Sequence, residues 1–286
     1  MKQLWRRVRQ IPPIGFVAEV GEVYFSRRVG RAAAQLAYFL ILTFFPILIC
    51  VSAFVGRLNL DLEEVLEGTD KLLPAGVNAI LEEYFVYLEN SQTSGMLVVG
   101  VIMTVFFASA AVRGLTNIMH EIYGRSTFRG VKQLAASVIF AVLLLVAIYL
   151  SLAVVVTGNW FFHMLERLLR MEDFAERFGA WQWLKYILLL SVVFAFILLL
   201  YRFTAPLAKP RPPVMVGALA ASMALVGASA VFAVMVSGST RYSLVYGSLA
   251  SVIILLVWLY LCGNILILGS VVNYVIYRRK SEKKNP

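Results

Sequence analysis

Six long stretches of this sequence contain no Asp, Glu, Lys or Arg, and they limit what the chain can fold into. A membrane-spanning helix needs about 20 consecutive, mostly apolar residues. A soluble domain of this size carries more charge than the 15% found here. The sequence therefore predicts an all-α, polytopic integral membrane protein with six transmembrane helices. The uncharged stretches are residues 32–56, 90–112, 133–165, 186–201, 212–240 and 242–277.

The basic residues lie on alternate sides of these six predicted spans. Residues 1–31, the second and fourth connections and residues 278–286 together carry 19 of the 26 Lys and Arg residues, whereas 12 of the 16 acidic residues fall in the first and third connections. Because an excess of Lys and Arg marks the cytoplasmic side, we expect both termini to be cytoplasmic. The net charge of +10 then favours anionic membrane lipids as partners and does not indicate nucleic acid.

The charge and apolar patterns divide the chain into three parts. Residues 15–31 mix apolar and basic positions as a helix lying on the cytoplasmic membrane surface would. The first and third connections carry apolar residues at helical spacing, which predicts extracytoplasmic amphipathic helices at about 57–92 and 158–183. The expected parts are a basic amphipathic segment at 1–31, a six-helix transmembrane domain at 32–277, and a basic tail at 278–286.

The residues that usually carry catalysis are scarce. The chain has two His and two Cys residues, and no Asp, Glu, Lys, Arg or His lies in the middle of a predicted span. We found no phosphate-binding loop and no paired metal-ligand motif. The sequence predicts no enzyme activity, no metal and no cofactor. A ribonuclease would need carboxylate or His ligands to hold a metal and activate water. The predicted cytoplasmic segments offer only Glu19, Glu22, Glu121, Glu282 and His120.

Polar residues near the span ends are the candidates for a substrate cavity. Asn264 and Asn273 are nine residues apart and therefore lie on opposite faces of a straight helix, while Gly269 shares a face with Asn273. Each amide could join two helices or face a cavity, and both alternatives stay open. The candidate lining residues are Gln35, Tyr38, Asn117, Asn264 and Asn273, with Arg113 and Arg202 at the cytoplasmic mouth. The candidate kink and helix-packing residues are Pro46, Gly217, Gly247 and Gly269.

Several segments resemble one known family. "AAQLAYFLILTFFPIL" at 33–48, "LTNIMHEIYG" at 115–124, "YRFTAPLAKPRPPVMVGALAA" at 201–221 and "YSLVYGSLASVIILLVWLYLCGNILILG" at 242–269 have the order and spacing of the YihY/BrkB membrane proteins. The resemblance covers nearly the whole chain. It implies a bacterial protein with six spans in the cytoplasmic (inner) membrane, in a family once labelled ribonuclease BN and now described as transporter-like or linked to envelope lipids.

The chain departs from the family pattern at one position. Many members carry a Glu two residues after the final glycine, and the matching residue here is Val271, whereas Asn273 matches the family's Asn. An ion coupling that used this Glu elsewhere would be absent from this chain.

The resemblance and the polar positions together favour a transporter-like protein. We expect it to handle a lipid or another amphipathic envelope molecule through a cavity between spans, by alternating access or lateral entry. The first alternative is a non-transporting membrane scaffold that docks envelope-biogenesis partners, and the second is a membrane-associated ribonuclease. A homo-oligomer is compatible with each of these.

Overall fold

The regular secondary structure of the computed structural model is helical. The structure describes residues 12–57, 94–124, 131–147, 150, 180–205, 212–237 and 249–282, and these ranges contain no strand. The all-α prediction is therefore confirmed for the described part of the chain. Its helices are α2 (Pro12–Ser26), α3 (Val29–Arg57), α6 (Ser94–Tyr123), the helix Val131–Ala147, α9 (Ala180–Thr204), α10 (Met215–Ser237) and α12 (Leu249–Glu282).

Four of these helices contain a segment that is long and apolar enough to cross a membrane. The segments are Val29–Ser52, Gly95–Tyr123, Met215–Phe232 and Leu249–Glu282. The protein is accordingly a multi-pass membrane protein. Two shorter apolar helices, Val131–Ala147 and Leu190–Thr204, coincide with the third and fourth predicted spans. Helix α9 as a whole is 25 residues long, and the count of six spans stays a prediction.

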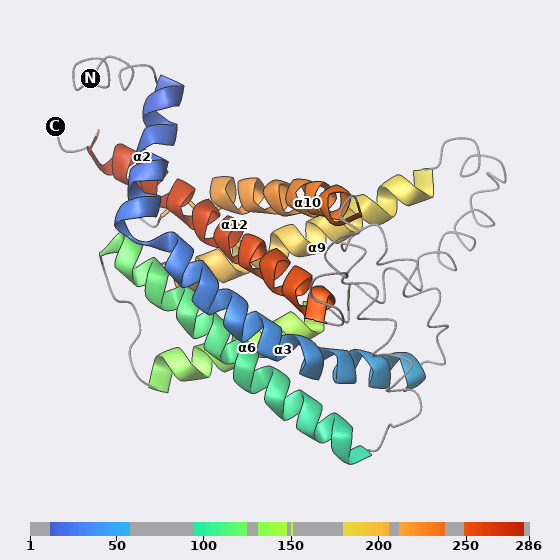
Figure 1. Cartoon of the computed structure of the whole chain (residues 1–286). Coiled ribbons are helices and arrows are strands. Elements are labelled where there is room, and N and C mark those ends of the chain that lie inside the picture. The colour runs from blue at the N-terminus through green and yellow to red at the C-terminus, as the bar shows by residue number, and fades with distance from the viewer. Residues whose placement is uncertain are drawn as a thin grey trace, which may run out of the picture.

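Helix α12 lies at the centre of the described bundle. It contacts α2, α3, α6 and α10, and α3 packs along α6 over much of its length. Figure 1 shows α12 running between α3 on one side and α10 on the other. The core is formed by small and branched side chains from all these helices, among them Ala33, Ala218 and Val271, which are buried completely. Residues on α12 therefore meet several helices at once.

A sharp turn separates α2 from α3. Arg28 has a φ of 52°, in the left-handed region that residues other than glycine rarely adopt. The turn lets α2 leave the line of α3 and cross the C-terminal part of α12 (Figure 1). Phe16, Val20 and Tyr24, spaced four residues apart, pack against the core. Residues 15–31 thus begin as a helix whose apolar face meets α12, and contact of this helix with a membrane surface stays a prediction.

Helix α3 contains Pro46, which the sequence predicts to kink the first span. Helix α3 runs through Pro46, and Figure 1 shows its axis changing direction in the second half, as expected for an internal proline.

The uncharged run 242–277 predicts that the last helix ends near Tyr277, but α12 continues to Glu282. No glycine or proline stops it there. Arg278 and Glu282 form an ion pair of 2.9 Å one turn apart, and basic residues favour a helix C-terminus.

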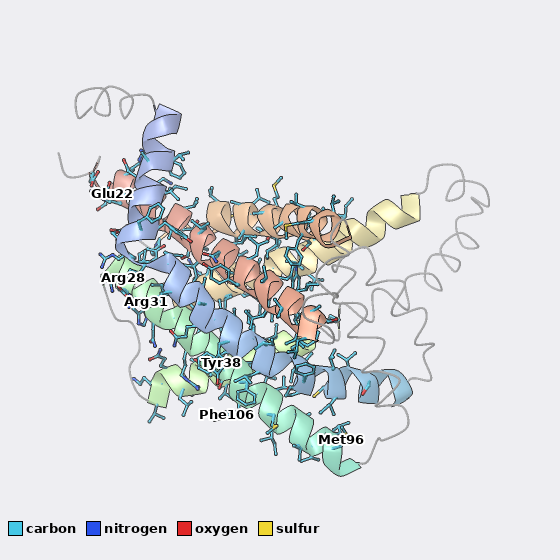
Figure 2. All side chains as sticks on the ribbon, viewed as in Figure 1. Glu22, Arg28, Arg31, Tyr38, Met96 and Phe106 are labelled. Carbon is cyan, nitrogen blue, oxygen red and sulfur yellow. The ribbon has the colours of Figure 1, made fainter. Side chains whose placement is uncertain are left out.

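The outer faces of the bundle are apolar. Ile102 and Phe106 on α6 and Val226 and Val231 on α10 are exposed, and Figure 2 shows side chains such as Phe106 and Met96 projecting from the bundle. Such a surface is unsuited to water and matches a lipid environment. The predicted outer helices at 57–92 and 158–183 fall almost entirely outside the described residues, as do Gly247 and residues 283–286.

Candidate functional site

A groove opens between α6 and the helix Val131–Ala147. Its volume is about 380 Å³. The groove is apolar along most of its length and polar only at one end. Its lining residues are Val101, Ile102, Val105, Phe106, Ser109, Arg113, Leu134 and Val138.

The polar end of the groove is formed by residues four apart on α6. Ser109, Arg113 and Asn117 follow one another at the spacing that places side chains on one helix face. The Arg113 guanidinium donates from Nη1 to Ser109 Oγ at 3.0 Å, and that hydroxyl donates to the Phe106 carbonyl oxygen at 2.8 Å. One turn further on, Gln133 Nε2 donates to Asn117 Oδ1 at 2.7 Å. This second bond ties the start of the helix Val131–Ala147 to α6.

Arg113 has a hydroxyl partner but no counter-charge in the described ranges. Among the described residues its polar partner is Ser109, and no carboxylate of these residues pairs with it. The 18 uncharged residues 95–112 precede it in α6, and they extend over about 27 Å. This length is close to the ~30 Å hydrocarbon thickness. Arg113 therefore lies one membrane thickness from the start of α6, at the depth where lipid headgroups would be found.

The amide of Asn264 is satisfied between α12 and α2. Asn264 is buried; its Oδ1 accepts from the Tyr24 hydroxyl at 2.9 Å and its Nδ2 donates to the Tyr260 carbonyl oxygen at 2.9 Å. Partial burial raises the pKa of the Tyr24 phenol above its usual value, which keeps the hydroxyl protonated as a donor. Asn264 thus joins α12 to α2, which is not one of the predicted spans.

Asn273 caps the start of α10 from a neighbouring helix. Its Oδ1 accepts from the Gly217 backbone N–H at 2.7 Å, and its Nδ2 donates to the Val214 carbonyl oxygen at 3.2 Å. The residues just before α10 are Pro212, Pro213 and Val214, none of which can cap a helix with its own side chain. Asn273 on α12 supplies the missing acceptor and is only 1% exposed.

The same crossing depends on two glycines. A Cβ added at Gly217 would overlap the Gly269 carbonyl oxygen and the Asn273 amide, and a Cβ at Gly269 would lie 2.7 Å from the Gly217 carbonyl oxygen. The two backbones therefore approach as closely as glycine permits. The Tyr201 hydroxyl, from α9, donates to the Leu266 carbonyl oxygen beside this crossing. Gly269 and Asn273 both contact Gly217 of α10 from one face of α12, as their spacing of four residues predicts.

The remaining candidates from the sequence lie apart from the groove. Gln35 and Tyr38 are exposed on α3, and Arg202 is exposed near the end of α9. Arg113 and Asn117 are brought together with each other but not with Asn264 or Asn273. The structure thus distributes these residues over several sites, and a single cavity lined by all of them stays a prediction.

Sequence reasoning gave no role to three residues that the structure makes important. Ser109 orients Arg113, and Gln133 orients Asn117. The recurrence of polar residues every four positions along α6 could have indicated the role of Ser109. Tyr24 was assigned only to an apolar helix face, although a buried tyrosine hydroxyl generally has a partner. No signal in the sequence identifies Asn264 as that partner, because the two residues are 240 positions apart.

The described residues offer few means of holding a metal. Within the ranges that the structure describes, no three His, Cys, Asp or Glu side chains gather closely enough to bind an ion. Cys50 and Cys262 are both free thiols, and the Cys50 sulfur lies 3.8 Å from Thr104 Oγ1 between α3 and α6.

Comparison with known proteins gives one family and one curated relative. Residues 21–286 match the family model described as "Virulence factor BrkB". The ribonuclease-like protein YfkH of Bacillus subtilis (strain 168) is 27% identical over 270 residues, which cover 93% of this chain and 97% of that protein. No solved structure matches the chain.

Proposed function

This chain belongs to the BrkB virulence factor family, and from this premise we propose that it is a transporter-like protein for an anionic, amphipathic envelope lipid. The resemblance derived from the sequence is confirmed by the family match. The proposal adds a site, the groove between α6 and the helix Val131–Ala147. An acyl chain would lie along the apolar walls, and the anionic head of the lipid would meet Arg113.

The observation that carries the proposal is an arginine at the end of an apolar groove, with no carboxylate partner among the described residues. A cation at headgroup depth would lie beside the anionic phosphates of lipids. Its guanidinium can bind two phosphate oxygens at once, a geometry that a lysine cannot offer. Ser109 uses one nitrogen of Arg113 and leaves the others for a ligand. From Val101 to Arg113 the groove covers 13 residues of α6, which span about 18 Å, a length comparable to an extended acyl chain.

The position of the groove favours lateral entry. Ile102 and Phe106 line it and are also exposed on the outer face of α6. A lipid could therefore pass from the bilayer into the groove without a path through the centre of the bundle. Movement of the headgroup past Arg113 would then be the transport step.

A reconstituted assay with a matched pair of variants tests the site. Val138 lines the groove, whereas its neighbour Ile139 is exposed and does not. In proteoliposomes that contain fluorescent phosphatidylglycerol, we expect Val138→Phe to fill the groove and reduce the rate of lipid movement between leaflets, and Ile139→Phe to leave it unchanged. Equal rates for the two variants would refute the groove as the site.

The same assay separates transport from a scaffold role. A scaffold would bind phosphatidylglycerol without moving it, so binding without any movement above that of protein-free vesicles would favour the scaffold. The ribonuclease alternative draws on the name of the Bacillus subtilis relative. Incubation of the purified chain with labelled RNA and divalent cations would reveal such an activity directly.

A further inference from the structure

Helix α2 leaves the bundle at a strained turn. Arg28, between α2 and α3, has a φ of 52°, a backbone conformation in which the Cβ of a residue other than glycine is crowded. Strain of this kind persists only where the surrounding contacts hold it in place. The contacts between α2 and α12 therefore offset the strain at Arg28, and that strain would be relieved if α2 turned away from α12.

The half of α2 nearest this turn is held by close packing. Val23 is buried in the core and Val20 packs against it. The Tyr24 hydroxyl donates to Asn264 Oδ1 on α12 at 2.9 Å. A rotation at Arg28 would move these residues least, because they are closest to the turn.

The outer half of α2 borders a cleft. The cleft lies between α2 and the C-terminal end of α12 and has a volume of about 650 Å³. Packing between the two helices is therefore incomplete at this end, where a rotation at Arg28 would move α2 furthest. The lining residues are Phe16 and Glu19 from α2 and Ile276, Arg279, Lys280 and Glu282 from α12.

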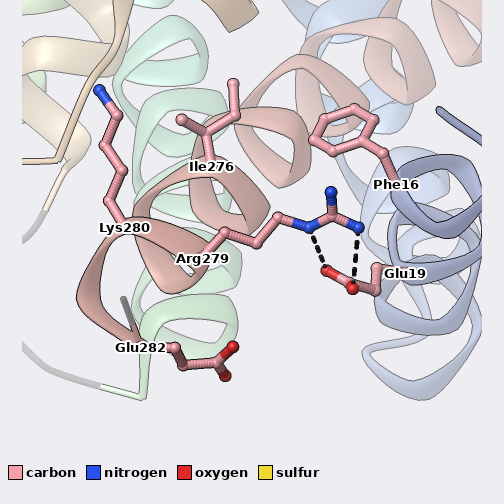
Figure 3. Close-up of a pocket in the computed structure, with 6 residues that line it drawn as sticks. All are labelled: Phe16, Glu19, Ile276, Arg279, Lys280 and Glu282. Carbon is pink, nitrogen blue, oxygen red and sulfur yellow. Dashed lines mark hydrogen bonds and ion pairs between the residues drawn. The ribbon is translucent and has the colours of Figure 1, made fainter. Parts of the chain in front are cut away.

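One ion pair joins the two walls of the cleft. Arg279 donates from Nε to Glu19 Oε2 at 3.0 Å and from Nη2 to Glu19 Oε1 at 2.9 Å. Figure 3 shows these two bonds, with the Phe16 ring beside the guanidinium. The ring centroid lies 5.3 Å from the guanidinium carbon and adds a cation–π contact. Charge therefore contributes to holding the outer half of α2 on α12.

Water and salt reach this ion pair. The Arg279 and Glu19 side chains are 34% and 29% exposed. The uncharged run 242–277 is followed at once by charged residues, so this end of α12 lies outside the hydrocarbon whichever side of the membrane it faces. Dissolved ions screen the attraction between exposed charges. The strength of the contact between Arg279 and Glu19 therefore falls as the ionic strength rises.

We propose that α2 is a salt-sensitive latch on α12, which turns about Arg28 and is held closed by the ion pair between Glu19 and Arg279. The structure shows the closed form. In the open form α2 leaves the end of α12, the cleft widens, and Asn264 Oδ1 loses the Tyr24 hydroxyl as its donor. The apolar contacts of α2 are lost on opening, so the open form is a minor population at low salt. The latch does not involve Arg113, and it therefore holds or fails independently of the proposed function.

The distance between two spin labels tests the latch in the purified full-length chain in neutral detergent. The labels are attached to cysteines introduced at Val17, exposed on the outer half of α2, and at Val231, exposed on α10, after Cys50 and Cys262 are replaced by alanine. Pulsed electron spin resonance then gives one distance for the closed form and a second for the open form. Raising the ionic strength from about 0.01 M to about 1 M shortens the Debye length from about 30 Å to about 3 Å. We expect the share of the second distance to rise over this range.

Matched variants separate the ion pair from general charge effects. Arg279→Gln should raise the ratio of open to closed form about fivefold at low salt and remove most of its dependence on salt. Arg278→Gln deletes an equal charge from a residue that pairs with Glu282 of its own helix, and it should leave the ratio unchanged. Exchange of the charges, with Glu19→Arg and Arg279→Glu together, should restore the closed form. Arg28→Gly should lower the ratio, because glycine adopts the φ of the closed turn without crowding.

Three results would overturn the proposal. A single distance that changes neither with salt nor in Arg279→Gln would show that α2 is a fixed part of the bundle. Equal shifts for Arg279→Gln and Arg278→Gln would indicate a response to net charge. A higher ratio of open to closed form in Arg28→Gly would show that opening does not relieve strain at this turn. The salt titration needs no change in the ion pair, so it decides the question even where melting temperatures reveal that a variant is not folded.

Discussion

Two helix pairs in this protein place polar side chains between apolar walls, and they do so with opposite results. Where α10 crosses α12, Asn273 is 1% exposed and both ends of its amide are bonded. Where α6 faces the helix Val131–Ala147, Arg113 has a single hydroxyl partner and lies at the end of an open groove. The first crossing has no room for another molecule, whereas the second has both space and a positive charge that no described carboxylate pairs with.

The difference shows how a polar residue at membrane depth can be assigned a role. A buried amide whose hydrogen bonds are all made within the protein stabilises the fold and has nothing left for a ligand. A cation with no counter-charge is poorly satisfied and gains most from an anion that enters from outside. A residue whose polar group has all its hydrogen bonds within the protein is therefore structural, and one whose polar group lacks partners is a candidate binding residue. Its presence in a span does not decide between the two.

The largest expected effect is at the close crossing. Gly217→Ala places a methyl group against the Gly269 carbonyl oxygen and should destabilise the protein by about 2 kcal/mol or more, as over-packing does. Gly227 lies in the same helix with nothing within 4 Å of its added Cβ, so Gly227→Ala should be neutral or slightly stabilising. Thermal unfolding of both variants in detergent measures the difference. Equal stability of the two would contradict the close approach of α10 and α12.

The next largest effect is expected at the cap of α10. Asn273→Leu removes the acceptor of the Gly217 N–H and leaves this donor buried without a partner, at a cost of about 1–3 kcal/mol. The matching change Asn264→Leu should cost less, because Tyr24 is partly exposed and its hydroxyl can bond to water. Unfolding of the two variants under identical conditions compares them. A smaller loss for Asn273→Leu than for Asn264→Leu would show that the cap is not needed.

Arg113→Gln should have the opposite effect, because it should change stability little and reduce lipid binding and movement. The substitution removes a charge that no described carboxylate balances, so we expect a stability change below about 1 kcal/mol. Retention of phosphatidylglycerol and its movement between leaflets should nevertheless fall. Parallel measurements of melting temperature and lipid movement test this separation. A large loss of stability with unchanged lipid movement would assign Arg113 to the fold.

The most local effect is expected at the junction of α2 and α12. Tyr24→Phe deletes one hydrogen bond to Asn264 and leaves the bond from Asn264 to the Tyr260 carbonyl oxygen in place. The expected loss is about 0.5–1.5 kcal/mol, the usual contribution of one such bond. Hydrogen exchange of α2 should accelerate locally, and exchange of the α10–α12 crossing should not. Faster exchange at both places would indicate that α2 supports the whole bundle.

The sequence by itself determined the class of the protein and part of its organisation. Long uncharged runs can be stable only where the backbone bonds to itself within a helix, which gives an all-α membrane protein. Helical spacing also placed Asn264 and Asn273 on opposite faces of one helix, and they do meet different neighbours, α2 and α10. These conclusions follow from distances along the chain, which the sequence states directly.

The tertiary structure alone decided which polar residues are free. Tyr24 and Asn264 are 240 positions apart, and Asn273 caps a helix that starts 58 positions earlier at Met215. The groove at Arg113 and the cleft at Arg279 likewise arise from pairs of helices that no local pattern relates. A hydrogen bond depends on a few tenths of an ångström between atoms brought together by packing. The residue types reveal which groups need a partner, and only the folded arrangement of the helices reveals which have found one.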